Sequence, residues 1–255
     1  MSAVRVAIAG ATGRMGLALL EAATQSEGVA LGGAVDIKAS TWGGVSIGTD
    51  VRSALAQADV LVDFTRPEGT LEHVRQCVDL ERAIVIGTTG FEPAQLAAIR
   101  EAGRRIPIVM APNMSVGVNV MLKLVALAAR ALEGYDIEVF EMHHRKKVDA
   151  PSGTALKLGQ VAAAARGGSL EDDGVFGRHG VTGERPEGAV GFSVARGGDV
   201  VGDHTVFFAG AGERIEVTHR STSRATYAQG AMRAARFVHG KPPGLYDMED
   251  VLGLR

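Results

Sequence analysis

A short apolar run that ends in a glycine-rich turn and leads into a helical pattern constrains the fold of this chain more than any other feature. Val4 to Ala9 is typical of a buried parallel strand, and Leu17 to Ala23 has helical periodicity. Between them lies the segment G-A-T-G-R-M-G, residues 10–16. A strand, a glycine turn and a helix in this order are typical of proteins that bind the pyrophosphate of a dinucleotide at the helix start. The segment therefore predicts a dinucleotide-binding βαβ unit.

Each glycine of this turn has its own physical role in the prediction. Gly10 permits the tight turn, Gly13 lets the backbone approach the pyrophosphate, and Gly16 lets the helix pack closely on the strand. Thr12 occupies the position of the middle glycine in the G-x-G-x-x-G form. The motif alone is for that reason a weaker signal than the common form, and the prediction depends on its strand and helix context.

An acidic residue follows the second predicted strand, Val29 to Val35. Asp36 lies about 20 positions beyond the turn, where a carboxylate can accept a hydrogen bond from a ribose 2′-hydroxyl. The alternative is an ordinary turn residue at a strand end. A carboxylate there should repel a 2′-phosphate and favour NADH, although Lys38 could soften that preference. The glycine-rich segment 42–49 is expected to be a loop.

Strand and helix patterns continue to alternate up to residue 112. Further strands are expected at 60–64, 84–86 and 106–110, and helices at 51–56, 68–80 and 93–104. This alternation predicts an α/β fold with a doubly wound parallel sheet of the Rossmann type. Ligands of such sheets lie beyond the carboxyl ends of the strands. The turn at 87–90 (G-T-T-G) could therefore line the nicotinamide, or it could be a plain βα turn.

The pattern changes in the second half of the chain. A long helical pattern at 116–132 precedes a strand at 137–142, a helix at 152–166 and strand-like runs at 190–196, 204–209 and 214–219. Strands clustered without intervening helices predict a second, α+β domain with an open mixed sheet. An open sheet needs cover, so we expect homo-oligomerisation through this domain. A last helical pattern at 224–238 could return to the first domain, which gives domains 1–115 with 224–255 and 116–223.

Five consecutive basic or potentially basic residues follow the strand at 137–142, namely His143, His144, Arg145, Lys146 and Lys147. The chain has a formal net charge of -2 and seven His, so this positive charge is strongly local. In an extended chain His143, Arg145 and Lys147 would share one face. A His exchanges protons near neutral pH, and a Lys surrounded by cations can have a lowered pKa and act as a general acid.

A helix start lies directly downstream of this basic segment. Pro151 suits the first turn of the helix, and Asp149 or Ser152 could cap it. The N–H groups of residues 152–154 would then be free to bind an anion. Together the two features predict a small substrate that carries carboxylates or phosphate. The alternatives are a solvated basic turn and phosphate contacts to nucleic acid. We do not expect a metal site, since adjacent His residues and one Cys provide too few ligands.

Composition narrows the class of protein further. Hydrophobic residues make up 46% of the chain and charged residues 22%, which permits a full core and excludes general disorder. The single Cys, Cys77, excludes an internal disulfide and favours a reducing compartment. A pI near 6.4 argues against general nucleic-acid binding. The N-terminus has no signal-peptide pattern, and no apolar run approaches the roughly 20 residues that span a bilayer, so a cytoplasmic protein is expected.

Seven segments together resemble the dihydrodipicolinate reductase family, also called the 4-hydroxy-tetrahydrodipicolinate reductase family, and they span essentially the whole chain. They are A-G-A-T-G-R-M-G, V-D-F-T-R-P-E-G-T, V-I-G-T-T-G-F, N-M-S-V-G-V-N-V, H-H-R-K-K-V-D-A-P-S-G-T-A, G-D-H-T-V-F-F-A and G-L-Y-D-M-E-D-V-L. The resemblance implies a Rossmann domain joined by the C-terminal segment, and a substrate domain whose sheets assemble a homotetramer. The implied reaction is reduction of 4-hydroxy-2,3,4,5-tetrahydrodipicolinate to tetrahydrodipicolinate, with NAD(P)H, in the diaminopimelate route to lysine.

The resemblance also assigns roles to individual residues. His143 and Lys147 match the catalytic acid/base and proton donor, and His144, Gly153 and Thr154 match the substrate contacts. The matched cofactor contacts are Gly10, Ala11, Thr12, Gly13, Arg14, Met15, Asp36, Gly87, Thr88, Thr89, Ala111, Pro112, Asn113 and Met114. Hydride transfer leaves negative charge developing nearby, so an acid is needed. Lys147 is the better candidate, while His143 could relay the proton or only orient the ring.

Two departures from the family pattern bear on the cofactor. Thr12 replaces a glycine seen in many relatives, and Ile37 stands where some relatives carry an Arg that would contact a 2′-phosphate. We therefore predict that NADH is preferred and NADPH tolerated. The main alternative function is a catalytically silent dinucleotide-sensing protein of the same fold. A reductase of amino-acid semialdehydes or imines is a further alternative, but Cys77 lies on a predicted helix far from the basic segment.

Overall fold

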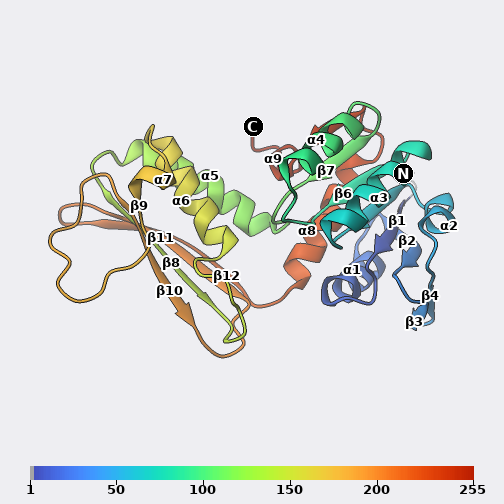
Figure 1. The fold of residues 1–255 in the computed structure, drawn as a ribbon, viewed down its shortest axis with the longest axis horizontal. Coiled ribbons are helices and arrows are strands. Elements are labelled where there is room, and N and C mark those ends of the chain that lie inside the picture. Colours follow the sequence, from blue (N-terminus) through green and yellow to red (C-terminus); the bar gives the residue numbers. More distant parts are fainter. Residues whose placement is uncertain (1–2) are drawn as a thin grey trace. The chain divides into compact units, whose positions relative to one another are not determined.

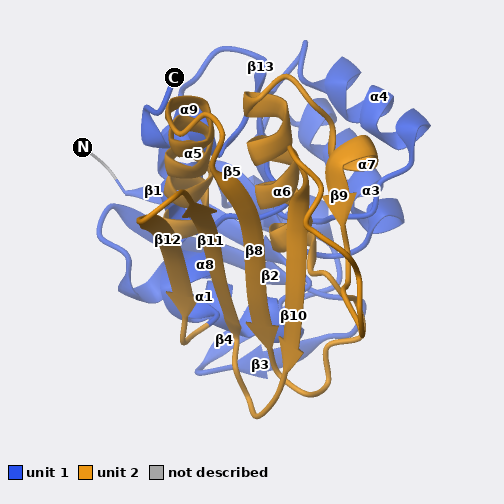
Figure 2. Ribbon diagram, turned by 90° about the vertical axis from the view of Figure 1, so that its left-hand side faces the viewer, with its two compact units in different colours: residues 1–116, 224–255 blue, residues 117–223 orange. Residues whose placement is uncertain are grey.

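The computed structural model describes residues 3–255, which fold into two compact units (Figure 2). One unit contains the described residues up to Val116 together with Arg224–Arg255. The other is Gly117–Ser223. The first unit is therefore built from two separate stretches of the chain.

The first unit is organised by a six-stranded sheet in which every pair of neighbouring strands is parallel (Figure 1). Its strands, in spatial order, are β2 (Val29–Val35), β1 (Val4–Ala9), β5 (Val60–Asp63), β6 (Ala83–Ile86), β7 (Pro107–Met110) and β13 (Gly244–Tyr246). The chain runs from β1 outward to β2 and then returns to β5 on the other side of β1. The predicted doubly wound sheet is confirmed, and its order reverses at the carboxyl end of β1, where such sheets bind ligands.

Helices cover both faces of this sheet, as the continuous apolar strands require. On one face α1 (Arg14–Gln25) and α8 (Ala225–Val238) bury Leu19, Leu20 and Met232 against the sheet. The other face packs against α2 (Val51–Ala56), α3 (Pro67–Asp79) and α4 (Pro93–Ala102), which bury Leu55 and Ile99. The C-terminal α9 (Met248–Leu252) adds Met248 and Val251 to the first of these cores.

The segment 42–49 is not a loop, so that prediction is wrong. It contains most of an antiparallel hairpin of β3 (Ser40–Trp42) and β4 (Val45–Ile47). Gly43 and Gly44 form the two-residue turn, with φ of 51° and 84°. Two adjacent residues with positive φ match the twist of a hairpin, so the glycines make the hairpin possible rather than prevent it.

The second unit is built on a mixed sheet of five strands, which confirms the predicted mixed sheet. In spatial order they are β12 (Arg214–Ser221), β11 (Gly202–Ala209), β8 (Asp136–His143), β10 (Val190–Arg196) and β9 (Gly174–Val175). β11 is antiparallel to β12 and β8, while β8, β10 and β9 are parallel. Long α5 (Val116–Ala131) and α6 (Gly153–Ala165) pack on one face, with short α7 (Leu170–Asp173) beside them (Figure 2).

Side chains alternate across this sheet, so each strand has one face toward the helices and one away from them. Val139, Phe192 and Phe208 are buried under α5 and α6. Phe140 and Ser193, which are neighbours in register, point to the opposite face. Within residues 117–223 no helix lies on that opposite face. Among residues 3–255, none of the helices has both the length and the apolar composition of a membrane span.

Candidate active site

The glycine turn at the end of β1 has the geometry that the sequence predicts. Gly10 has φ of 69°, a conformation that side chains disfavour, and Gly13 is the N-cap of α1. A Cβ on Gly16 would lie 2.1 Å from the carbonyl oxygen of Gly10 and 2.6 Å from the Ala11 backbone. The helix start is therefore pressed against the turn, and only glycine fits there. This cradle fits a dinucleotide, with the helix N–H groups directed at the pyrophosphate position.

Asp36 lies beside this turn and is held by it. Its Oδ2 accepts hydrogen bonds from the Thr12 N–H at 2.8 Å and the Thr12 hydroxyl at 2.6 Å, and its Oδ1 accepts from the Ile37 N–H at 2.7 Å. Partial burial acts to raise the pKa of Asp36, but the bonds from Thr12 and Ile37 outweigh it, so the pKa lies below its ordinary value. The carboxylate is thus charged and fixed beside the glycine turn.

Two further loops at the carboxyl edge of the sheet hold the other predicted cofactor contacts. After β6, Gly87 packs against the Phe64 ring, where a Cβ would approach to 2.2 Å. Thr88 is buried and Thr89 is exposed. After β7, Ala111 and Met114 are buried, whereas Pro112 is exposed and the Asn113 side chain accepts from the Ser115 N–H at 2.9 Å. The side chains of Ala111 and Met114 therefore belong to the core.

A buried carboxylate, Asp63, lies next to the first of these loops, where the Thr88 hydroxyl is 3.4 Å from its Oδ1, and sequence reasoning did not identify it. Its Oδ1 accepts from the Thr65 N–H at 2.8 Å and the Thr65 hydroxyl at 2.6 Å, and its Oδ2 pairs with His73 Nδ1 at 2.6 Å. The Thr70 hydroxyl donates to the Thr88 hydroxyl at 2.8 Å. The loop that carries Thr88 is thereby tied to α3 through side chains.

In the second unit the basic segment does not continue β8, which ends at His143. The prediction of one shared face for His143, Arg145 and Lys147 is therefore wrong. The chain turns, with the Lys147 N–H donating to the His144 carbonyl at 3.0 Å. His143 points into the protein, while Arg145 and Lys146 lie exposed on the turn. A turn is favoured because the Arg145 N–H bonds the Gly198 carbonyl, and the Gly197 N–H bonds the His143 carbonyl.

The start of α6 also differs from the prediction in two details. Pro151 precedes the helix instead of lying in its first turn. Ser152, one of the two predicted caps, is the N-cap, with its hydroxyl accepting from the Ala155 N–H at 3.2 Å. The Ser152 N–H is not free, because it donates to Glu141 Oε1 at 3.0 Å. Gly153 and Thr154 are the first two residues of the helix. The Ser152 N–H is therefore excluded from the predicted anion-binding groups.

His143 belongs to a buried polar cluster that packs behind the basic segment. Its Nδ1 lies 2.5 Å from Glu141 Oε2, and Arg196 holds both oxygens of the same carboxylate at 2.9 Å. The Ser152 hydroxyl contacts His204 Nε2 at 3.2 Å, and the His143 and His204 rings meet edge to face with centroids 5.1 Å apart. One cluster thus connects β8, β10, β11 and the start of α6.

Burial and charge set the protonation of this cluster. Burial acts to raise the pKa of Glu141, but bonds from Arg196 and His143 outweigh it, so the pKa is lowered. Burial lowers the pKa of His143 despite the opposing carboxylate. Burial, assisted by His143, lowers the pKa of His204 to about 4. Both histidines are therefore neutral at neutral pH, beside an ionised Glu141.

Lys147 lies at the edge of this cluster. Its Nζ is 2.9 Å from Asp149 Oδ1, and that ion pair lowers the pKa of Asp149. The Arg196 guanidinium donates to the Asp149 carbonyl at 2.5 Å, which ties the loop to the buried Glu141. Lys147, the predicted proton donor, thereby lies on the same loop as His143, the predicted acid/base residue. His144, a predicted substrate contact, lies between them in sequence.

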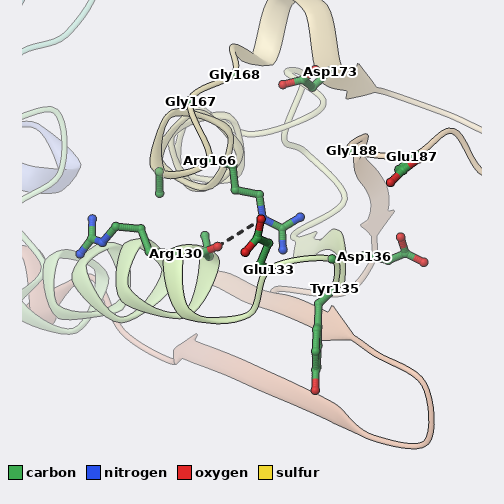
Figure 3. A pocket seen from close by; sticks show the side chains of 13 residues that line it. Arg130, Glu133, Tyr135, Asp136, Arg166, Gly167, Gly168, Asp173, Glu187 and Gly188 are labelled. Carbon is green, nitrogen blue, oxygen red and sulfur yellow. Dashed lines mark hydrogen bonds between the residues drawn. The ribbon is translucent and has the colours of Figure 1, made fainter.

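A cavity of about 600 Å³ lies elsewhere in the second unit and contains none of the predicted site residues. It is lined by the C-terminal ends of α5 and α6 and the loops that follow them, which include Glu133, and by Asp136 of β8 and Asp173 of α7 (Figure 3). Arg166 crosses it to donate to the carbonyls of Ala129 and Leu132. Within the described part of the chain, no group of three or more His, Cys, Asp or Glu is arranged to hold a metal ion.

Both halves of the chain match models of one family. The model described as dihydrodipicolinate reductase, N-terminus, matches residues 4–114, and the model described as dihydrodipicolinate reductase, C-terminus, matches residues 117–252. The chain belongs to the dihydrodipicolinate reductase family. The resemblance of the seven sequence segments is therefore confirmed.

Individual members of the dihydrodipicolinate reductase family match over nearly their full length. The 4-hydroxy-tetrahydrodipicolinate reductase of Aromatoleum aromaticum is 56% identical, covering 100% of this chain and 97% of the relative. That of Bordetella pertussis is 57% identical, covering 98% and 97%. The solved dipicolinate-bound dihydrodipicolinate reductase from Paenisporosarcina sp. TG-14 superposes with a TM-score of 0.80 at 26% identity, covering 97% of this chain and 98% of that one.

Sequence reasoning missed three members of the buried cluster in this dihydrodipicolinate reductase family protein: Glu141, Arg196 and His204. A signal for Glu141 was present, since it shares the buried face of β8 with Ile137, Val139 and His143. A carboxylate in that position needs a cationic partner. Nothing local in the sequence identified Arg196 as that partner, because the two are brought together only by strand pairing.

Proposed function

We propose that this chain is an NAD(P)H-dependent 4-hydroxy-tetrahydrodipicolinate reductase, which converts 4-hydroxy-2,3,4,5-tetrahydrodipicolinate to tetrahydrodipicolinate. The observation that carries the proposal is the match over nearly the full length, at 56% and 57% identity, to two enzymes of that name. The dinucleotide cradle at β1 and the cationic segment beside the start of α6 supply the two binding functions that such a reaction needs.

The substrate carries two carboxylates, and the second unit offers complementary groups for them. Gly153 and Thr154 lie in the first turn of α6, where backbone N–H groups and the helix dipole favour an anion. His144 and Lys147 precede that turn. A family relative has been solved with dipicolinate, a planar dicarboxylate, which supports this class of ligand. We assign substrate binding to His144, Gly153 and Thr154.

In this reaction the substrate gains one hydride and one proton, and it loses its 4-hydroxyl group as water. Bound NADH or NADPH supplies the hydride. We assign the proton to Lys147, because neutral His143 with its proton on Nδ1, toward Glu141, offers only a lone pair at Nε2. His143 then accepts a hydrogen bond from the substrate or from a water and orients the ring. When the substrate binds, the Lys147 ammonium group leaves its ion pair with Asp149 and contacts the substrate instead.

A direct assay separates this proposal from the silent dinucleotide-sensing alternative. Purified protein is mixed with NADH and freshly generated 4-hydroxy-tetrahydrodipicolinate, and NADH oxidation is followed by absorbance. The reductase oxidises NADH only when the substrate is present. The sensing protein binds NADH, as measured by fluorescence, and leaves it unoxidised.

For the cofactor we propose that NADH is preferred and NADPH tolerated. Thr12 holds Asp36 charged beside the glycine turn, where we propose that the ribose binds, and Ile37 offers no positive charge to a 2′-phosphate. The test compares kcat/KM for the two cofactors in the native protein and in Asp36→Ala. The native protein should favour NADH, and the variant should lose most of that preference. A strong native preference for NADPH would defeat the argument from Asp36.

We also propose that copies of the chain associate through the mixed sheet of the second unit. The family resemblance implies that the assembly is a homotetramer. Its helix-free face presents Phe140 and Phe207 half-buried and Ser193 exposed. An antiparallel or mixed sheet with one uncovered face of this kind gains stability when a second sheet packs on it.

A further inference from the structure

The Glu141 side chain is completely buried, and both of its oxygens have two partners. Oε1 accepts from the Ser152 N–H at 3.0 Å and from Arg196 Nη2 at 2.9 Å. Oε2 is bound by Arg196 Nη1 at 2.9 Å and by His143 Nδ1 at 2.5 Å. Arg196 neutralises the buried charge, so the carboxylate is stable where it lies. The bonds from the Ser152 N–H and from His143 Nδ1 are not needed to neutralise this charge, so they indicate a further role.

Those two bonds go to the two ends of one loop. His143 is the last residue of β8, and Ser152 is the N-cap of α6. The residues between them include His144 and Lys147, to which the proposed function assigns substrate binding and proton donation. A single rigid group therefore fixes the imidazole and the start of the anion-binding helix relative to each other.

The bond to His143 also determines which ring nitrogen is available. A carboxylate at Nδ1 favours the tautomer with its proton on Nδ1, so Nε2 carries the lone pair. Nε2 lies beside Gly202, where a Cβ would come within 3.0 Å of it. Glycine at position 202 leaves space next to this nitrogen, and His204 on the same strand packs against the ring edge.

From these contacts we infer that Glu141 is a positioning residue for the reduction: it orients His143 and holds the start of α6 at a fixed distance from it. The inference rests on the proposed function and deepens it. A misplacement of about 1 Å between catalytic and binding groups can lower the rate about a hundred-fold. The competing explanation is that Glu141 only ties β8 to β10 and contributes to folding alone.

The same strand offers a matched control. Glu138 is also a β8 carboxylate bound by arginines, with Arg178 Nη1 at 2.9 Å and Arg185 Nε at 3.0 Å. It lies on the opposite face of the sheet from Glu141, because the two positions differ by an odd number of residues. Glu138→Gln therefore removes a paired charge from β8 without touching His143 or α6.

The experiment compares Glu141→Gln, Glu141→Asp and Glu138→Gln with the native protein. Four quantities are measured: NADH affinity, kcat/KM for 4-hydroxy-tetrahydrodipicolinate, the thermal midpoint, and the His143 tautomer by ring ¹⁵N NMR without substrate. Glu141→Asp keeps the charge for Arg196 and therefore the fold, but it is one methylene too short to reach both His143 and Ser152.

If Glu141 is a positioning residue, Glu141→Gln lowers kcat/KM about a hundred-fold at unchanged NADH affinity. Glu141→Asp has a kcat/KM between those of Glu141→Gln and the native protein. The Nδ1-protonated form of His143 is no longer dominant in Glu141→Gln. Glu138→Gln keeps the native kcat/KM and the native His143 tautomer, whatever its thermal midpoint. Native-like kcat/KM in both Glu141 variants, or a loss that only follows the folded fraction with the tautomer unchanged, overturns the inference. Failure of the native protein to reduce the substrate overturns the proposed function instead, and the NMR comparison still decides the orientation of His143.

Discussion

At the scale of single residues, Lys147 carries the largest catalytic prediction. Lys147→Ala should lower kcat by about 10²–10⁴-fold, because the variant lacks the positioned acid for the proton step. NADH affinity should be unchanged, since the cradle of Gly10, Gly13 and Gly16 lies in the other unit. Steady-state kinetics and NADH fluorescence titration measure the two effects. Lys146→Ala is the control, because Lys146 is the exposed neighbour on the same turn; an equal loss in both variants would argue for a general charge effect.

The buried histidine of β11 makes the stability of the protein depend on pH. The pKa of His204 is about 4 in the folded protein and about 6.5 when unfolded, so the folded state disfavours the protonated form. The contribution of His204 to stability is therefore fully present above its unfolded pKa and is lost as the pH falls from 6.5 toward 4. From pH 7 to 5 the free energy of unfolding should drop by about 2 kcal/mol because of this residue.

Urea unfolding of His204→Asn at the two pH values checks this contribution. The variant should lack most of the drop attributed to His204, although His143 and His219, whose pKa values are also lowered by burial, act in the same direction. His179→Asn replaces an exposed histidine and should retain the native pH dependence. Identical pH dependence in the native protein and His204→Asn would contradict the argument.

At the scale of elements, the contact between α1 and the glycine turn is the most sensitive to a small change. Gly16→Ala places a Cβ against the backbone of Gly10 and Ala11, which cannot move as a flexible side chain would. The expected cost is about 1–3 kcal/mol of stability, with NADH Kd raised about tenfold or more as the turn shifts. Calorimetry and NADH titration test this. Gly177→Ala, whose Cβ meets nothing within 4 Å, should change neither quantity.

The elements that could be predicted from the sequence are those with a local pattern. The apolar runs of β1 and β5, the glycine turn and the caps of α6 each depend on neighbours in sequence. β13 could not be predicted, because three residues, Gly244–Tyr246, become a strand only by pairing with Pro107–Val109. The Gly43-Gly44 hairpin could not be predicted for a different reason: adjacent glycines are typical of loops, and their positive φ is equally what a tight hairpin turn uses.

The same distinction explains the candidate site. The basic segment and the helix start are contiguous in sequence, so the sequence alone predicts a positively charged site for an anionic ligand. The cluster behind them depends on register: β8 pairs His143 with Arg196 of β10, and Glu141 with His204 of β11. No sequence spacing specifies that register. The turn at 144–147 likewise depends on a distant residue, because the Arg145 N–H bonds the Gly198 carbonyl, so the chain is not extended there.

At the scale of the whole molecule, the mixed sheet predicts self-association, and Ser193 gives a way to test it. Ser193 is exposed in the single chain and lies next to Phe140 of the central strand β8, on the helix-free face. Ser193→Glu should therefore leave the chain folded. Between two packed sheets the same carboxylate would be buried without a partner, which is strongly unfavourable. We expect the native protein to sediment as an oligomer and Ser193→Glu to sediment as a smaller species at the same concentration.

The control for this prediction makes the same kind of change on the other side of the unit. Gln160→Glu adds one negative charge at an exposed position of α6, away from the helix-free face. It should sediment as the native protein does, because no sheet contact is altered. Dissociation by both variants would indicate that net charge weakens association, and dissociation by neither would exclude the neighbourhood of Ser193 from the interface. Dissociation by Ser193→Glu alone, with an unchanged circular dichroism spectrum, assigns the interface to the sheet, because only that variant places a charge between the packed faces.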